Sequence, residues 1–243
     1  AIGFGTVVDS LSAIKTLVFE QKRLSMKELL EALDCNFEGK EDIQALLQGA
    51  PSFGNGDLEV DTLGRMLEKS ALDFTARYAG KNGVQPLEIR TTSVTANVPH
   101  GKFVGATPNG RKAWMPLSDG SSPSHGSDRN GPTAVLLSQY QSTNWNAANR
   151  ACRLLNMKMA PKTVEGEEGT KKLVDLIRAF INLRVWHLQM NIINRETLVA
   201  AQKDPQKYKN LVVRIAGYSA YFVDLSPDLQ NDLIDRTEQE NCD

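Results

Sequence analysis

The sequence has few cysteines, and their spacing excludes the common cysteine-based sites. Cys35, Cys152 and Cys242 are odd in number and far apart, so they form neither a disulfide framework nor a CxxC metal site. We therefore expect no bound metal. Reduced thiols are typical of cytoplasmic proteins, and we expect this location.

The chain also lacks an excess of either charge and any long apolar run. Its 28 basic and 29 acidic residues leave a formal net charge of −1, so there is no basic surface for nucleic acid or for an anionic membrane. No apolar run reaches the ~18 residues of a membrane span, and the first residues do not form a signal peptide. We expect neither nucleic acid nor a membrane as a partner. The chain opens without Met in a glycine-containing loop, which indicates processing or truncation.

What is present is typical of a globular protein with a sizeable core. The 243 residues are 41% hydrophobic and 23% charged. Apolar residues recur at helical spacing over residues 9–78, and Ser25 with Glu28 forms a capping-box pattern. Residues 99–132 contain five prolines and six glycines, with apolar residues between them, so we predict a long ordered loop.

Helices and strands alternate through the rest of the sequence. We predict helices over residues 62–79, 132–150, 170–183 and 196–202, and a last helix with Ser226 as its N-cap. β-branched and alternating patterns predict strands over residues 89–98, 185–193 and 211–216. In the second strand His187, Gln189 and Asn191 share one face, which is the pattern of a strand with one polar side.

The most specific motif lies just after the last predicted strand. Residues 212–220, Val-Val-Arg-Ile-Ala-Gly-Tyr-Ser-Ala, resemble the signature of glycyl radical enzymes, the family that includes pyruvate formate-lyase. Residues 105–113, 116–120, 130–134 and 194–198 are similar to other recurrent segments of that family. The resemblance is nearly continuous from Arg90 to the end, and the N-terminal third is compatible with it.

The resemblance implies that Gly217 stores an unpaired electron on its α-carbon. Such a radical is stabilised by the amide nitrogen on one side and the carbonyl on the other, and it needs a near-planar centre that a residue without Cβ reaches most easily. We expect the loop to be buried, with Arg214, Tyr218 and Phe222 as its support and Tyr221 as a further wall. The resemblance implies a radical-SAM activating enzyme as partner and no bound cofactor.

The resemblance also implies a fold and a set of boundaries. We expect an α/β protein: the C-terminal part of a ten-stranded α/β barrel surrounded by helices, with residues 1–88 as a helical flanking segment truncated at its N-terminus. Residues 89–193 would supply barrel strands and the long loop, and residues 194–243 the glycine radical domain. The full-length protein is expected to be a homodimer. The family's thiyl-forming cysteine loop has no counterpart here, so the chain alone should be inactive.

Residues 124–128 and 137–144 look closest to those of isethionate sulfite-lyases. The implied reaction is cleavage of the C–S bond of a small hydroxyalkanesulfonate to sulfite and an aldehyde. Arg90 would bind the sulfonate, because its planar guanidinium suits a permanently ionised oxyanion, although a simple pair with Glu88 is the alternative. His187, Gln189 and Asn191 could line the barrel, or His187 could be a core histidine in a hydrogen-bond network. A glycyl radical dehydratase or another lyase of the family, and a non-catalytic fragment that complements a partner enzyme, remain alternatives.

Overall fold

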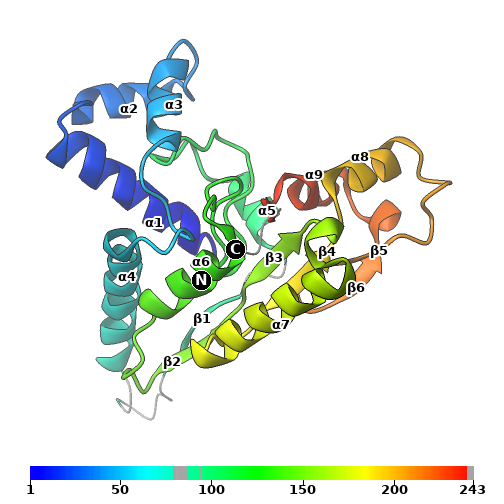
Figure 1. Ribbon diagram of the computed structural model, residues 1–243. Helices are drawn as coiled ribbons and strands as arrows, with labels where there is room; N and C mark the ends of the chain where they lie inside the picture. Colours follow the sequence, from blue (N-terminus) through cyan, green and yellow to red (C-terminus); the bar gives the residue numbers. More distant parts are fainter. Residues whose placement is uncertain (79–80, 82–86, 93–94, 240–243) are drawn as a thin grey trace.

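The computed structural model describes residues 1–78, 81, 87–92 and 95–239 and has an α/β architecture, as the sequence predicts. A helical group at one end, a central mixed layer and a smaller C-terminal unit follow one another along the molecule (Figure 1). No helix in the described part of the chain is long and apolar enough to cross a membrane. Cys242 lies outside the described residues.

The N-terminal region is helical. Its elements are α1 (Phe4–Ala13), the π-helical continuation η1 (Ile14–Glu20), α2 (Met26–Asp34), α3 (Glu41–Gln48) and α4 (Leu58–Ala76). The predicted capping box begins α2: Ser25 Oγ accepts from the Glu28 N–H, and the Glu28 carboxylate accepts from the Ser25 N–H. Leu17, Leu29 and Phe37 are among the buried residues that join α1, η1 and α2 into one core cluster.

The central layer is built on short parallel strands. β1 (Ile89–Thr91) pairs with β2 (Arg150–Arg153), and β3 (Asn156–Met159) lies between β4 (Gln189–Ile192) and β7 (Glu238–Gln239). The helices α6 (Gly131–Gln141) and α7 (Gly166–Asn182) connect these strands, and η3 (Pro161–Val164) precedes α7. A second core cluster forms where α6, α7 and β3 pack together.

The C-terminal unit contains a β-hairpin held between helices. Its elements are α8 (Arg195–Lys203), β5 (Val212–Arg214), β6 (Ser219–Tyr221), η4 (Phe222–Asp224) and α9 (Pro227–Asp235). Leu198, Val213, Phe222 and Leu233 belong to its buried core cluster. As predicted, Ser226 precedes the last helix and Pro227 is its first residue, where the missing N–H of proline is tolerated.

Several predicted boundaries are wrong. The strand predicted over residues 89–98 ends at Thr91, residues 93–94 lie outside the described part, and Asn97 begins α5 (Asn97–Gly101). The helix predicted over residues 132–150 ends at Gln141, because Ser142 and Thr143 turn their hydroxyl groups back onto carbonyls of the last helical turn. The sequence missed β2 and β3, and Cys152 lies in β2.

Candidate functional site

The glycine signature folds into a tight hairpin. β5 and β6 pair antiparallel with Arg214 opposite Ser219, and residues 215–218 form the connection. The Ile215 N–H donates to the Tyr218 carbonyl across a distance of 2.9 Å, which closes the turn. Gly217 therefore lies at the tip of the hairpin.

The backbone of Gly217 has a conformation that favours glycine. Its φ is +85°, in the region where L-residues with a side chain are strained. Among the described residues, no atom beyond its two chain neighbours lies within 4 Å of the place where a Cβ would be, so packing in this part of the chain does not exclude a side chain there. The residue is exposed within this chain. One side of the α-carbon is thus open to an approaching group.

Two amide side chains of β4 hold this hairpin by its backbone. Gln189 Oε1 accepts from the Gly217 N–H at 2.6 Å. Asn191 binds Arg214 twice: its Oδ1 accepts from the Arg214 N–H at 2.8 Å, and its Nδ2 donates to the Arg214 carbonyl. Two of the three residues that the alternation placed on one polar face therefore bind the glycine hairpin, while His187 precedes β4.

A buried guanidinium joins the hairpin to the rest of the protein. Arg236, at the end of α9, donates to the Ile215 carbonyl at 3.2 Å. Its second terminal nitrogen lies 3.0 Å from Asp119 Oδ2 and 3.1 Å from Asp232 Oδ2. All three side chains are nearly inaccessible, with 7% or less exposed. Burial lowers the pKa of Arg236, but the two carboxylates more than offset this effect and the net direction is upward.

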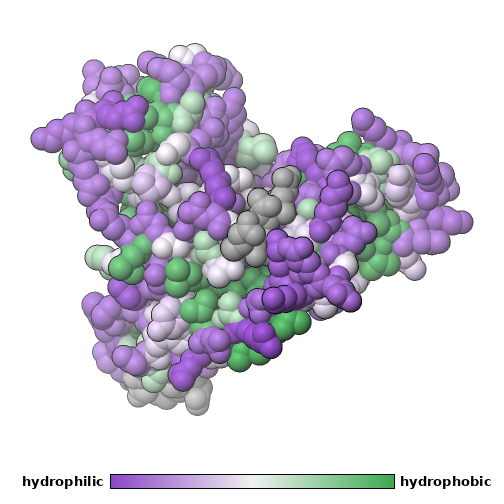
Figure 2. All heavy atoms as spheres, viewed as in Figure 1, coloured by the Kyte–Doolittle hydropathy of each residue, from purple (hydrophilic) through white to green (hydrophobic). Residues whose placement is uncertain are grey.

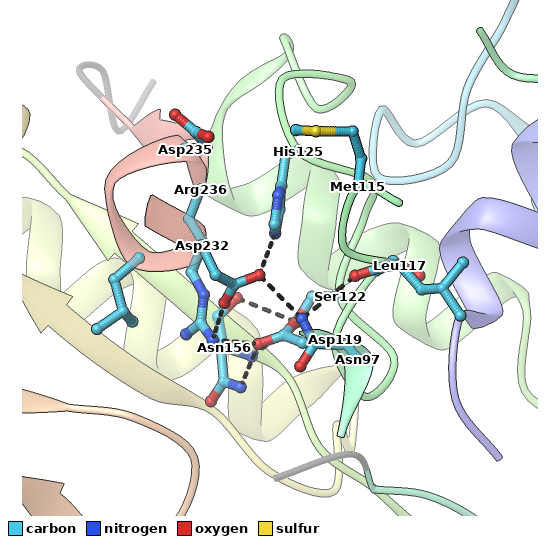
Figure 3. Close-up of polar contacts among 12 residues, drawn as sticks. Asn97, Met115, Leu117, Asp119, Ser122, His125, Asn156, Asp232, Asp235 and Arg236 are labelled. Atoms are coloured by element: carbon cyan, nitrogen blue, oxygen red, sulfur yellow. Dashed lines mark hydrogen bonds and ion pairs between the residues drawn. The ribbon is translucent and has the colours of Figure 1, made fainter. Parts of the chain in front are cut away.

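Neutral side chains complete this network (Figure 3). Asn156 Nδ2 donates to Asp119 Oδ2 at 2.7 Å, and Asn97 Nδ2 donates to Asp232 Oδ1 at 2.9 Å. His125 points toward the same carboxylate, with its Nε2 at 3.5 Å from Asp232 Oδ1. The guanidinium balances one of the two negative charges, and the amide hydrogen bonds give the carboxylates further polar partners inside the protein.

The C-terminal end of α9 is fixed by two further cations. Lys158 Nζ, on β3, donates to the Ile234 carbonyl at 2.9 Å, and Arg195 Nη1 donates to the same carbonyl at 2.8 Å. Both bind a carbonyl that the helix leaves unpaired. Burial is the main cause that lowers the pKa of Lys158 to about 8, while nearby Glu238 opposes it. Sequence reasoning missed Lys158 and the Arg236 network, except that Asp119 belongs to a segment already similar to the family.

The predicted support residues do not enclose Gly217 within this chain. Phe222 is fully buried in the core beneath the hairpin. Tyr218 and Tyr221 are 43% and 48% exposed, and Arg214 is exposed with its Nη1 at 3.3 Å from Ser219 Oγ. The expectation of a buried glycine loop is therefore wrong for these residues taken alone. About half of the surface of Tyr218 and of Tyr221 is left open by the described residues.

Arg90 lies at the surface of β1. Its side chain is 63% exposed, and its Nη2 lies 2.9 Å from Glu88 Oε2. The N-terminal amine of Ala1 donates to the Arg90 carbonyl. An ion pair this exposed is weak, so the guanidinium can exchange its partner for another anion.

The described residues contain no cluster of three or more His, Cys, Asp or Glu side chains that could hold a metal ion. Cys35 follows α2 and Cys152 lies in β2, and both are partly buried free thiols. His187 Nδ1 is a buried atom without a hydrogen-bond partner in the described part of the chain, so this nitrogen does not take part in the network expected of a core histidine.

Protein-family models match most of the chain, including the hairpin that bears Gly217. The glycine radical family model matches residues 117–223, and the pyruvate formate lyase-like model matches residues 1–101. An isethionate sulfite-lyase of Nitratidesulfovibrio vulgaris is 61% identical over 236 residues, which are 97% of this chain and 28% of the relative.

Two solved structures of other proteins resemble this chain over nearly its whole length. The hydroxyproline dehydratase of Clostridioides difficile with trans-4-hydroxy-L-proline bound has a TM-score of 0.90 at 39% identity, over 98% of this chain and 30% of that one. A glycyl radical enzyme of Archaeoglobus fulgidus has a TM-score of 0.87 at 36% identity, over 99% of this chain and 30% of that one. The chain thus spans less than a third of the length of these proteins. Its signature hairpin, its fold and both family matches show that the chain belongs to the glycyl radical enzyme family.

Proposed function

We propose that this chain is the C-terminal part of a glycyl radical lyase that cleaves the C–S bond of isethionate. The radical would be stored on the α-carbon of Gly217. The main structural support is the hairpin itself, which presents an exposed glycine α-carbon and is held through backbone hydrogen bonds at Arg214, Ile215 and Gly217. The 61% identity to an isethionate sulfite-lyase favours the sulfonate substrate.

Activation would be the loss of one hydrogen atom from Gly217. A radical-SAM activating enzyme supplies a carbon-centred radical, which takes the hydrogen atom, so that the C–H bond breaks homolytically and the unpaired electron remains on the glycine. The open side of the α-carbon, where the described residues other than the two chain neighbours place no atom within 4 Å of the Cβ position, would give the activating enzyme access. The oxygen sensitivity of such a radical fits the anaerobic cytoplasm that we propose as its location.

Substrate turnover would need a cysteine from outside this chain. In the proposed cycle the glycyl radical takes the thiol hydrogen atom, and the thiyl radical takes a hydrogen atom from the hydroxyl-bearing carbon of isethionate. The C–S bond then breaks, the hydroxyl proton leaves, and the hydrogen atom returns by way of the cysteine, giving sulfite and an aldehyde. The reaction is redox-neutral and needs no further oxidant.

Arg90 is proposed to bind the sulfonate in the complete barrel. It is exposed in this chain and has one weak carboxylate partner, Glu88, which a sulfonate can replace. Arg90→Met should raise KM for isethionate at least tenfold, and Arg90→Lys should recover part of that loss. The matched control is Arg178→Met, at a similarly exposed ion pair on α7. An unchanged KM in Arg90→Met would assign Arg90 a structural role.

The deciding experiment uses the full-length enzyme that contains this chain, activated without oxygen and incubated with isethionate. Stoichiometric sulfite and aldehyde are expected. Water elimination without sulfite from a diol, hydroxyproline or dihydroxypropanesulfonate would favour a dehydratase instead, which the likeness to hydroxyproline dehydratase keeps as the second candidate. If the chain restored activity to an oxygen-cleaved partner enzyme in trans, the non-catalytic fragment would be favoured. Light scattering of the full-length enzyme tests the proposed homodimer.

A further inference from the structure

A polar pair on β4 is aimed at the radical hairpin. Gln189 and Asn191 are two residues apart in a strand, so their side chains lie on the same face. The strand is fixed by parallel pairing with β3 over its whole length, from Asn156 opposite Gln189 to Met159 opposite Ile192. The two side chains therefore project toward the hairpin from a hydrogen-bonded strand and not from a loop.

Asn191 fixes the hairpin before the glycine. Its amide donates to the Arg214 carbonyl and accepts from the Arg214 N–H, which is how a neighbouring strand would bind that residue. Arg236 binds the next carbonyl, at Ile215. The path of the backbone is thus set on the N-terminal side of Gly217 by contacts that do not involve Gly217.

Gln189 contacts the glycine itself. Its Oε1 accepts from the Gly217 N–H at 2.6 Å. The orientation of the amide is fixed by this bond, because a backbone N–H needs an acceptor and the side-chain nitrogen can only donate. Gln189 is 7% exposed, and its Nε2 is a buried atom without a hydrogen-bond partner among the described residues. Among the described residues, the Gln189 side chain therefore makes one hydrogen bond, and its partner is the Gly217 N–H.

We propose that Gln189 is a positioning residue for the glycyl radical. The inference rests on the proposed function, since it concerns the residue on which the radical is stored. A carbon radical at Gly217 is stabilised when its half-filled orbital lies parallel to the π-systems of both flanking amides. The hydrogen bond to Gln189 holds the plane of the N-terminal amide, and it also polarises the N–H so that the nitrogen donates more electron density to the α-carbon. Gln189 acts through the amide and does not touch the reacting hydrogen atom.

The test compares three substitutions at one position in the activated full-length enzyme. Gln189→Met keeps the length of the side chain and removes the acceptor. Gln189→Glu keeps an acceptor oxygen and exchanges the nitrogen, which has no recorded partner in the described residues. Gln189→Asn keeps the amide but shortens it by one methylene group. The control is Gln202→Met, at a glutamine of α8 that binds Gln230 and Asn231 away from the hairpin.

Two readouts separate a positioning role from a merely structural one. In ¹⁵N-glycine-labelled enzyme, the ¹⁵N hyperfine coupling of the glycyl radical should change in Gln189→Met and return toward the original value in Gln189→Glu. Hydrogen exchange at the Gly217 amide, measured before activation, should be about five-fold faster in Gln189→Met, which is the effect expected for one lost hydrogen bond. Gln202→Met should change neither.

Each outcome decides the proposal. An unchanged coupling and unchanged exchange in Gln189→Met, or the same changes in Gln202→Met, would overturn it. If Gln189→Met does not fold, Gln189→Asn is measured in the same way, and its oxygen is too distant to replace the bond. If the unaltered enzyme gives no glycyl signal at all, the proposed function fails and the electronic role with it, while amide exchange still decides whether Gln189 holds Gly217.

Discussion

Replacing Arg236 by methionine should release the hairpin that bears Gly217. The guanidinium binds the Ile215 carbonyl and lies within 3.1 Å of one oxygen of Asp119 and one of Asp232. Methionine fills a similar volume but leaves both carboxylates buried without a cation. Removing one partner of a buried ion pair costs about 3–5 kcal/mol, much of it from the charge left behind. We expect the free energy of unfolding to fall by this amount, and the hairpin, which also loses its hydrogen bond from Arg236 to the Ile215 carbonyl, to open more readily.

The assay is native-state hydrogen exchange of the amides of residues 211–222, because local opening is measured segment by segment. Arg236→Lys should recover part of the loss, since it restores the charge but not the planar fork. The triple variant Arg236→Met with Asp119→Asn and Asp232→Asn should be less damaged than Arg236→Met alone, because neither of the two carboxylate charges is left without its cation. Exchange rates in Arg236→Met equal to those in the exposed-pair control Arg178→Met would refute this role for the network.

Three further predictions concern stability. Burial raises the pKa of Asp61 to about 7 from a usual value of 3.8, so the folded state keeps a proton that the unfolded state releases. Stability is therefore lost as pH rises toward 7. Asp61→Asn should raise the melting temperature at pH 8 by more than at pH 5, and equal effects at both pH values would contradict this. A Cβ at Gly120 would lie 2.5 Å from the Leu154 carbonyl oxygen, whereas one at Gly39 meets nothing within 4 Å, and both glycines have positive φ. Backbone strain at positive φ costs about 1–2 kcal/mol in Gly39→Ala, and Gly120→Ala adds a steric clash to that strain, so it should lower the melting temperature more. The reverse order would be inconsistent with the packing. Apolar residues gather on the visible face beside the β5–β6 hairpin and below α7 (Figure 2), and exposed side chains include Val212, Ile181 and Trp186. We therefore expect the isolated chain to aggregate. A monomer by light scattering that melts cooperatively in calorimetry would contradict the prediction.

The parts of the fold that a single sequence could predict are those with local signals. The capping box at Ser25, the proline at the start of α9 and the signature around Gly217 each specify structure within a few residues. The alternation around Gln189 was also visible, although its partner was not. The proposed domain boundaries at residues 88/89 and 193/194 stay predictions.

The parts that the sequence could not predict depend on distant contacts. A lysine is usually expected at the surface, yet Lys158 in β3 is only 3% exposed. Its partners are carbonyl groups of α9, which lies far from β3 in the sequence, so no local pattern indicates that it is buried. The Arg236 network joins residues from the long loop, β3 and α9, and no local pattern connects Asp119 with Asp232. The exposure of Gly217 was also missed, because the family resemblance implies a wall that this chain does not itself supply.

Electron paramagnetic resonance of the full-length enzyme, activated without oxygen, tests the central claim most directly. The spectrum should be a doublet from the remaining α-hydrogen of Gly217, and it should collapse to a single line when the glycine is labelled with deuterium at its α-carbon. Gly217→Ala should abolish the signal, and brief exposure of the unaltered enzyme to air should cleave the backbone at this residue. A doublet that persists in Gly217→Ala, or air exposure that leaves the chain intact after a signal has formed, would contradict the assignment of the radical to Gly217.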